Sequence, residues 1–441
     1  MLARRSTWTR NEVVIDGLTA MKAEPNPLFI STMKNEGPYI LEWLAYHRVI
    51  GFSQFLIYTN DCTDGTTDLL DRLAVLGCVQ HERNVVLRRG PHKSALKYAK
   101  EHPLTKSAEW IYVADIDEYL NIHVGDGKVQ DLIAAHPEAD AIPVTWRLFS
   151  HGDQLELEDP YLLETLCDAE RTLEDGGQKS RFVKTLFRND HRVERFGLHT
   201  PIVSEEYKED FRWIAPDGRV LGVADNKSRP ESQFAYDGAQ VNHYAVRSLD
   251  GYLVKKDRGR ANHYRQNLGT DYWRRMCRGG HEDRSIQRHL PAVRAEMARL
   301  LEDKRLADLH ASSLAWHKAK VVELRALSDF EALRNEILAL SEAKDHHRKE
   351  DSDHPVDSVS EGLHAIQNLA QASKHRPVGG SDDLGFRKDV SPLLTSLRQT
   401  LQCIQPLEAQ LEAAGLINRL EAVYERKVSS DIGVIEADVT K

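Results

Sequence analysis

The acidic residues with the most informative setting are Asp115 and Asp117, in the run Asp115-Ile116-Asp117-Glu118 directly after the apolar residues 110–114. On an extended segment, carboxylates at positions i and i+2 point to the same side. With diphosphate oxygens they would form the oxygen-rich shell that Mg²⁺ or Mn²⁺ prefers. An acidic turn that caps a helix is the simpler interpretation of an isolated pair, but the strand-like run before this pair favours a metal site.

Two more polar loops follow apolar runs. The candidate ligand-binding side chains in them are Lys34, Asn35 and Glu36 after residues 28–33, and Asn60, Asp61 and Asp64 after residues 55–58. Their amides and carboxylates could bind a base or ribose. They could equally cap the helices that follow, with Asn35 before Pro38, or Asp64 or Thr66 before the next helix.

The elements that must position these side chains alternate between strand and helix. Short β-type runs occur at 28–33, 55–58, 78–81, 110–114 and 141–146, with helical patterns near 38–50, 66–76, 92–101 and 128–136 between them. This order predicts an α/β fold, doubly wound around a mainly parallel sheet. Since ligands of such sheets lie beyond the carboxyl ends of the strands, the loops at 34–36, 60–66 and 115–118 should converge on one edge.

The pattern changes along the second half of the chain. Shorter strand candidates lie at 182–187, 200–204, 219–223 and 239–245, and helical patterns occupy 285–302, 306–343, 361–373 and 391–425. The polar stretches 346–357 and 373–383 are predicted to be linkers or exposed loops. We therefore expect a catalytic domain over 25–265 and a helical C-terminal region over 285–430. These helices most often pack on a core, although binding of a partner or a membrane stays open.

Composition limits the partners and the compartment. The 441 residues carry a net charge of −9, which gives no support to a nucleic-acid partner. Five scattered cysteines without a CxxC pair indicate free thiols in a reducing compartment. The sequence contains no run of about 18 apolar residues, so we expect no membrane span. We expect a cytoplasmic protein, with peripheral association at the inner membrane face left open.

Three blocks stand in a recognisable order. They are Lys34-Asn35-Glu36 with Glu42-Trp43, His47 and Gly51; Tyr58-Thr59-Asn60-Asp61 with Asp64-Gly65-Thr66; and Trp110 with Asp115-Ile116-Asp117-Glu118-Tyr119. Together they resemble bacterial family 2-like glycosyltransferases, over about residues 25–150 and more weakly to about 265. The resemblance implies a GT-A fold, a nucleotide-sugar donor such as a UDP-sugar, a divalent cation, inversion at the transferred sugar, and a role such as polysaccharide biosynthesis. A glycan, a lipid-linked molecule or another hydroxyl compound would be the acceptor.

Further site residues follow from this resemblance. His243, in the run Val241-Asn242-His243-Tyr244, would complete the metal shell with Asp115 and Asp117, and His199 is the rival candidate. The basic patch Lys255, Lys256, Arg258 and Arg260 would bind the diphosphate, unless it is a solvated helix face. A carboxylate must also deprotonate the acceptor hydroxyl. Asp153 is the candidate for this base, with Glu156 and Glu158 as alternatives.

Two other functions compete with glycosyl transfer. A nucleotidyltransferase also binds a nucleotide and a metal on an α/β sheet, but it usually has a Gly-rich, Arg-containing loop after the first strand. Residues 34–38, Lys-Asn-Glu-Gly-Pro, lack that character. An inactive glycan-binding or scaffold protein is the second alternative, and the retention of both aspartates argues against it.

Overall fold

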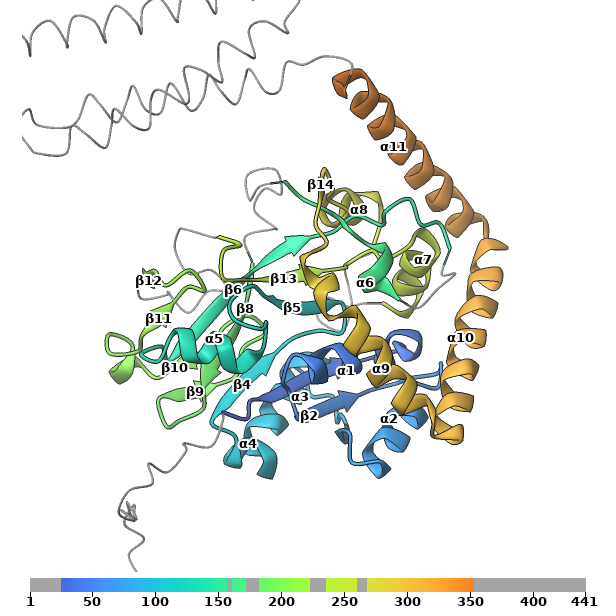
Figure 1. Cartoon of the computed structure of the whole chain (residues 1–441). Helices are drawn as coiled ribbons and strands as arrows, with labels where there is room; N and C mark the ends of the chain where they lie inside the picture. Colours follow the sequence, from blue (N-terminus) through green and yellow to red (C-terminus); the bar gives the residue numbers. More distant parts are fainter. Residues whose placement is uncertain (1–24, 157–160, 172–181, 223–234, 260–267, 353–441) are drawn as a thin grey trace, which may run out of the picture. The chain divides into compact units, whose positions relative to one another are not determined.

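The computed structural model describes residues 25–156, 161–171, 182–222, 235–259 and 268–352. The described residues up to Ile337 form one compact unit, in which helices surround a mixed, mostly parallel sheet (Figure 1). Of the second unit, residues 338–441, the described part is the continuation of one helix to Ser352. The predicted helices at 361–373 and 391–425 and the predicted linker at 373–383 lie outside the described residues.

The first half of the sheet is parallel and has the strand order β3-β2-β1-β4. Its strands are β1 (Leu28–Met33), β2 (Gln54–Thr59), β3 (Gln80–Arg83) and β4 (Trp110–Val113). The connections between them hold η1 (Gly37–Tyr39), α1 (Ile40–Val49), α2 (Thr66–Val75), α3 (Pro91–Glu101) and α4 (Pro103–Ser107). Because every connection returns to the same end of the sheet, the loops after β1, β2 and β4 meet at the carboxyl edge, as predicted.

The second half of the sheet is mixed. Its principal strands are β5 (Glu118–Ile122), β6 (Ala141–Leu148), β8 (Val183–Arg188) and β13 (Ala239–His243). Strand β8 is antiparallel to both β4 and β6, whereas β13 is parallel to β6 and antiparallel to β5. The α/β class with a mainly parallel sheet is thus confirmed. The sequence pattern had not revealed β5, because its five residues are all buried and show no alternation.

Smaller elements complete this half. They are α5 (Val129–Ala135), α6 (Leu162–Thr165), β7 (Asp168–Ala169), β9 (Val193–Arg195), β10 (Ile202–Val203), η2 (Glu205–Tyr207), β11 (Trp213–Ile214), β12 (Val220–Leu221), α7 (Leu249–Arg258), α8 (Thr270–Met276), β14 (His281–Glu282) and η3 (Ser285–His289). Helix α7 follows β13 directly, which brings its basic residues to the carboxyl edge of the sheet.

An aromatic core fixes the first strand and helix. The ring of Phe29 on β1 lies 4.8 Å from that of Trp43 on α1 and 5.1 Å from that of Tyr112 on β4. All three side chains are fully buried. Burial of such large apolar groups is the main term that holds the helix on the sheet.

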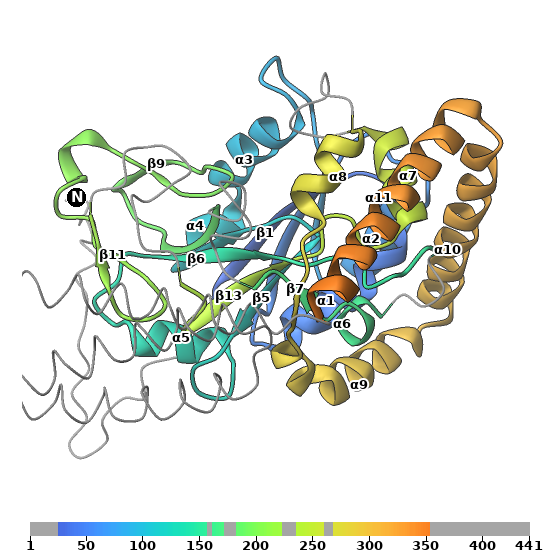
Figure 2. The same ribbon diagram turned by 90° about the horizontal axis from the view of Figure 1, so that it is seen from above.

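The C-terminal helices cover one side of this unit. Helices α9 (Leu290–Leu301) and α10 (Lys304–Arg325) run past α1, α2 and α7, as the view from above shows (Figure 2). Helix α11 (Ser328–Ser352) continues through residues 346–352, where the sequence predicted the start of a linker. That prediction was wrong for these residues: they are polar, but they contain no Gly or Pro to end a helix. No described helix is both long and apolar enough to cross a lipid bilayer.

Candidate active site

The acidic motif lies in a turn between β4 and β5. The backbone N–H of Glu118 donates to the carbonyl of Asp115 at 3.1 Å, and the N–H of Asp115 donates to the Glu118 carboxylate at 2.8 Å. The expectation that Asp115 and Asp117 stand on an extended segment was therefore wrong. The turn separates the two carboxylates, so that each meets a different lysine.

Asp115 is the more accessible of the two, with 34% of its side chain exposed. Its Oδ2 lies 3.3 Å from Nζ of Lys184 on β8, and its Oδ1 lies 3.9 Å from Nε2 of His92 at the start of α3. Burial alone would raise the pKa of Asp115, but the charges of Lys184 and His92 hold it below the usual value. The carboxylate is thus ionised at neutral pH.

Asp117 is buried, and a cation and a histidine face it. Its Oδ2 accepts a 2.7 Å hydrogen bond from Nζ of Lys255 on α7, and Nε2 of His243 lies 3.8 Å from its Oδ1. Burial opposes ionisation, yet Lys255 and His243 hold the pKa of Asp117 well below its usual value. Lys255 also donates to the carbonyl of Ala245 at 2.7 Å, so its position is fixed from two sides.

Lys184 is a site residue that the sequence analysis missed. It is buried, and its ammonium lies 3.0 Å from the fully buried carboxylate of Glu118 as well as near Asp115. Burial works against its charge, but these two carboxylates raise the pKa of Lys184 above its usual value. Burial also raises the pKa of Glu118, to about 8. Lys184 stands inside the predicted strand 182–187, where a charged residue in an apolar run was the available signal.

The two loops after β1 and β2 are tied to each other. Oδ1 of Asn35 accepts from the backbone N–H of Thr63 at 2.8 Å, and its Nδ2 donates to the Thr63 hydroxyl at 3.2 Å. Both carboxylate oxygens of Asp64 accept backbone N–H groups, from Gly37 and from Thr66, each at 2.9 Å. Asp64 therefore binds the N–H of Thr66, the first residue of α2, from the position before the N-cap, which is Gly65 and not the predicted Asp64 or Thr66.

Asn60 and Asp61 differ in their exposure. Asn60 is buried, and its Oδ1 has no hydrogen-bond partner among the described residues. Asp61 is exposed and adopts a left-handed backbone conformation with φ of 50°. Non-glycine residues in this region are uncommon and are found at turns and binding sites. Nδ2 of Asn60 donates to Oδ2 of Asp61 at 3.3 Å, and the exposed carboxylate stays accessible to a ligand at the mouth of the loop.

Two arginines hold the buried carboxylate of Glu36. Nη1 of Arg247 lies 2.8 Å from its Oε2, and Arg258 on α7 bonds its Oε1. Arg258 also donates to the carbonyls of Lys34 and Asn35. The basic patch is therefore partly engaged in fixing the loop after β1. Lys256 points elsewhere, with its ammonium 5.9 Å from the ring centre of Phe330, and Arg260 lies outside the described residues.

Arg247 has further binding capacity. Its guanidinium stacks on the ring of Tyr39 at 3.7 Å, and its Nε and Nη2 are buried without a hydrogen-bond partner in the described structure. A small pocket opens here, whose lining includes Glu36, Tyr39, Arg247, Lys255, Arg258 and His317 of α10. Burial lowers the pKa of His317 to about 4, so its imidazole is neutral. No sequence pattern predicted that a residue beyond position 300 would line this pocket.

The two candidate histidines both lie near the ring of Trp146. The ring of His243 is 4.2 Å from that of Trp146, and the ring of His199 is 5.3 Å away. Burial lowers the pKa of His243, which leaves the neutral form that binds metals. Nδ1 of His199 contacts the carbonyl of Val183 at 2.9 Å. Of the two, His243 is the one in contact with the acidic turn.

The side chains at the acidic turn supply some, but not all, of the ligands that a divalent cation needs. Oxygen ligands from Asp115 and Asp117 and a neutral imidazole from His243 are of the right chemical kind. However, the described residues contain no group of three or more His, Cys, Asp or Glu side chains gathered closely enough to hold a metal. A cation at this turn would need further ligands from the substrate, and it would share the carboxylates with Lys184 and Lys255.

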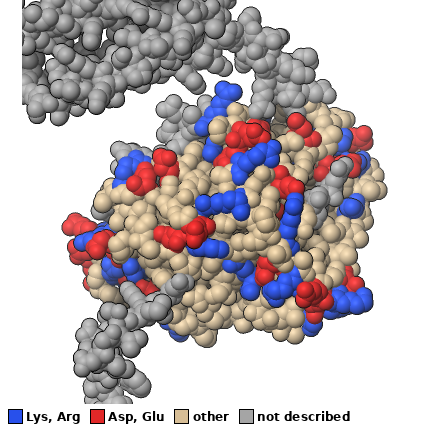
Figure 3. Space-filling model, viewed as in Figure 1, with Lys and Arg blue, Asp and Glu red and all other residues tan. Residues whose placement is uncertain are grey.

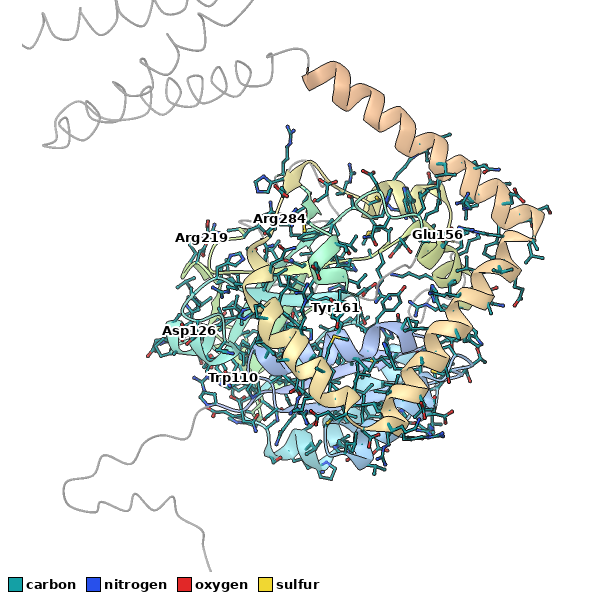
Figure 4. All side chains as sticks on the ribbon, turned by 45° about the vertical axis from the view of Figure 1, so that its right-hand side comes forward. Trp110, Asp126, Glu156, Tyr161, Arg219 and Arg284 are labelled. Carbon is teal, nitrogen blue, oxygen red and sulfur yellow. The ribbon has the colours of Figure 1, made fainter. Side chains whose placement is uncertain are left out.

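The candidate bases are less well placed. Asp153 is exposed in the loop after β6, with a left-handed φ of 60°, and no contact with the acidic turn is found among the described residues. Glu156 is bound to Arg325 at 2.8 Å, and its position near the C-terminal helices is visible in Figure 4. Glu158 lies outside the described residues. Asp153 stays a prediction.

Residues 30–161 match the model of glycosyltransferase family 92. Among curated proteins, a family 92 protein of Ricinus communis is 26% identical over 106 residues, which are 23% of this chain and 18% of that protein. One of Oryza sativa subsp. japonica is 27% identical over 104 residues, which are 23% of this chain and 17% of that protein. The match thus spans less than a fifth of each curated relative.

Solved structures are similar at a lower level. S. aureus TarS residues 1–349, in complex with UDP-GlcNAc, has 19% sequence identity and a TM-score of 0.22 over 27% of this chain and 34% of that one. A second structure of the same fragment has 18% identity and a TM-score of 0.24 over 37% and 47%. TM-scores of this size carry no conclusion about this chain.

The family match supports the coarser part of the predicted resemblance, that to a glycosyltransferase. The matched family is 92, the curated relatives are plant proteins, and a bacterial family 2-like type stays a prediction. The matched stretch contains both tied loops and the whole acidic turn. Over residues 30–161, this chain is therefore similar to glycosyltransferase family 92.

Proposed function

We propose that this protein transfers a sugar from a nucleotide diphosphate donor, such as a UDP-sugar, to a hydroxyl acceptor. The observation that carries the proposal is the pair Asp115 and Asp117 at the carboxyl end of β4, ionised and faced by Lys184 and Lys255. Such a turn stabilises charge that moves between sugar and diphosphate. The similarity of residues 30–161 to a glycosyltransferase family supports it independently.

The tied loops would hold the nucleoside. Asn60 and Asp61 offer an amide oxygen and an exposed carboxylate, and Lys34 stands on the other tied loop, after β1. Three other side chains in these loops already have partners: Asn35 binds Thr63, Glu36 binds two arginines, and Asp64 binds backbone amides. They would therefore hold the loops in place rather than bind the ligand. In this arrangement they would set the shape of the loops that receive the base and ribose.

The cations of residues 247–258 would face the diphosphate. The buried Nε and Nη2 of Arg247 have no hydrogen-bond partner among the described residues, and Lys255 is held between Asp117 and the carbonyl of Ala245. A guanidinium forms paired hydrogen bonds to phosphate oxygens, which suits Arg247 to this role. Arg258 would hold the neighbouring loop in place.

We further propose that Mn²⁺ or Mg²⁺ is bound by Asp115 and Asp117, with His243 as a further ligand. Such an ion would neutralise the charge that accumulates on the departing diphosphate. His243 already contacts Asp117, and burial keeps its imidazole neutral. Lys255 and Lys184 contribute positive charge to the same turn whether or not an ion is present.

The proposal also includes a catalytic base, an acceptor and a compartment. Inversion at the sugar requires one carboxylate to take the proton of the acceptor hydroxyl, and Asp153 is the proposed base. The acceptor would be a glycan, a lipid-linked molecule or another hydroxyl compound, as in polysaccharide biosynthesis. We place the reaction in the cytoplasm, with peripheral association at the inner face of a membrane, and we expect no nucleic-acid partner. On the face in Figure 3, acidic and basic side chains alternate without a large patch of one sign.

Calorimetric titration with UDP, with and without Mn²⁺, tests the proposal. The parent should bind UDP more tightly with Mn²⁺, and Asp117→Asn should lose this difference. Asp126→Asn, at an exposed turn, is the matched control and should behave as the parent. No UDP binding in any condition would contradict the enzyme and favour a scaffold. Equal binding with and without Mn²⁺ would contradict the metal and leave the lysines as the neutralising groups.

Product analysis separates glycosyl transfer from nucleotidyl transfer. With a set of UDP-sugars, the parent should release UDP and the sugar, by transfer or slow hydrolysis. A nucleotidyltransferase would instead release pyrophosphate from UTP and a sugar phosphate. Formation of pyrophosphate, with no release of UDP, would contradict the proposed function.

A further inference from the structure

The loop between β3 and α3 exposes three consecutive aliphatic side chains. Val85, Val86 and Leu87 are 65%, 45% and 38% exposed, respectively. Aliphatic residues exposed one at a time are common on protein surfaces, but three in sequence at the tip of one loop are not explained by folding. We call residues 85–89 the tip.

This exposure is fixed by the fold. The backbone N–H of Asn84 donates to the carbonyl of Thr59 at 2.7 Å, and its side-chain amide donates to the carbonyl of Pro91 at 2.9 Å. The N–H of Leu87 donates to the Ser94 hydroxyl at 2.8 Å. Hydrogen bonds at both ends therefore hold the tip in a defined conformation with its side chains outward.

Cationic residues surround the aliphatic ones. Residues 83–100 contain six Lys or Arg and no Asp or Glu, in a chain whose net charge is −9. Four of the six are exposed and form no ion pair with a described acidic residue: Arg88, Arg89, Lys93 and Lys97. Lys93 and Lys97 are one turn apart on α3, so their charges lie on one helix face.

The tip is at the same edge of the sheet as the candidate active site. It follows the carboxyl end of β3, and it leads into α3, whose His92 lies 3.9 Å from Asp115. In the view from above, the segment before α3 stands out from the neighbouring elements (Figure 2). A surface that receives the tip would therefore lie close to the mouth of the site.

We propose that the tip inserts into the surface of a membrane that contains anionic lipids. Aliphatic side chains with flanking Lys and Arg are the combination that binds the boundary between headgroups and acyl chains. A stable protein interface needs about 800 Å² on each partner, far more than three aliphatic side chains supply. This names a surface for the peripheral association proposed above, and lipid binding itself does not depend on glycosyl transfer.

Co-sedimentation of the full chain with vesicles tests this proposal. The parent should bind vesicles of phosphatidylcholine with 30 mol% phosphatidylglycerol and bind pure phosphatidylcholine weakly. Val86→Glu with Leu87→Glu should weaken binding to the anionic vesicles by about tenfold or more. The matched control is Val75→Glu with Leu76→Glu. These two residues are 74% and 39% exposed, and they stand at the C-terminal end of α2, outside the tip. That control should bind as the parent does.

The contribution of the basic residues to membrane binding is tested with a second pair of variants. Arg88→Gln with Arg89→Gln should weaken binding to anionic vesicles by roughly thirtyfold, while Arg305→Gln with Lys318→Gln, on α10, should leave it unchanged. Equal losses in the tip variants and their controls would overturn the proposal, as would a parent that binds neither vesicle. Self-association of the parent that the tip variants abolish, without vesicle binding, would assign the tip to a protein contact instead. Asp117→Asn should bind vesicles normally, which separates this test from that of the enzyme.

Discussion

The loops after β1 and β2 and the turn after β4 use their acidic side chains in different ways. In the loops, Asp64 gives both carboxylate oxygens to backbone N–H groups. In the turn, Asp115 and Asp117 each give one oxygen to a lysine, and the other oxygen of each lies 3.8 to 3.9 Å from a histidine nitrogen. Both regions lie at the same edge of the sheet and contain similar residue types.

This difference separates residues that build the site from those available for chemistry. A carboxylate saturated by backbone amides has little capacity left for a ligand, and its loss weakens the fold. A carboxylate held ionised by a lysine ammonium keeps its charge and can exchange that partner for another cation. The turn is therefore the part of this edge where a change should alter activity more than stability.

The largest effect should come from the turn. Asp115→Asn keeps the shape of the side chain but removes its charge, so sugar transfer should fall by about 10²- to 10³-fold. The free energy of unfolding should change by less than about 1 kcal/mol, because Asp115 is partly exposed. Rate measurements and urea unfolding on the same variant check both statements. Loss of stability with unchanged activity would reverse the distinction between the two regions.

The tied loops should show the opposite behaviour. Asp64→Ala leaves two buried backbone N–H groups without acceptors, so the free energy of unfolding should fall by about 3 kcal/mol. Urea unfolding measures this loss. Thr63→Ala, next to it in an exposed position, is the control and should lose much less. An unchanged midpoint in Asp64→Ala would mean that the loops are held by other contacts.

Glu170 is a buried carboxylate for which no ion pair is found among the described residues, and it extends the comparison to pH. Burial raises the pKa of Glu170 to about 7, and its Oε1 accepts from the N–H of Leu148 and the hydroxyl of Tyr236. Because this pKa is above that of the unfolded chain, the folded protein binds the extra proton, and stability falls as pH rises from 5 to 7 by about 2 kcal/mol from this group. Glu170→Gln should remove that slope. Unfolding midpoints at several pH values test it, and a slope equal to the parent's would contradict the assignment.

The smallest effect should come from the exposed end of the second loop. Asp61 stands at a positive φ that glycine adopts without strain, so Asp61→Gly should change the free energy of unfolding by no more than about 0.5 kcal/mol. If Asp61 contacts the nucleoside, UDP affinity should fall by about fivefold, the loss of one hydrogen bond. Calorimetry measures it. Unchanged affinity would place Asp61 outside the nucleoside site.

Many strands and helices of the first half of the sheet were predictable from local sequence patterns. The strands at 28–33 and 110–113 and the helix that starts after Pro38 match the predicted runs closely, because short apolar segments between turn residues have few alternatives in an alternating α/β chain. The short strands β7, β9 and β14 were not predictable. They are two or three residues long and depend on their partners rather than on their own sequence.

The sequence by itself determined which polar loops would meet, since the order of strands and helices brings the carboxyl ends of parallel strands to one edge. It also identified Asp115, Asp117 and His243, three side chains that the structure brings near one another. Only the tertiary structure decided the partners of these groups. Lys184 and Arg247 come from positions far along the chain, and their charges help to keep Asp115 and Asp117 ionised, while His317 lines the neighbouring pocket. Local residue patterns do not encode such distant contacts, because electrostatic interaction depends on distance in space and on burial.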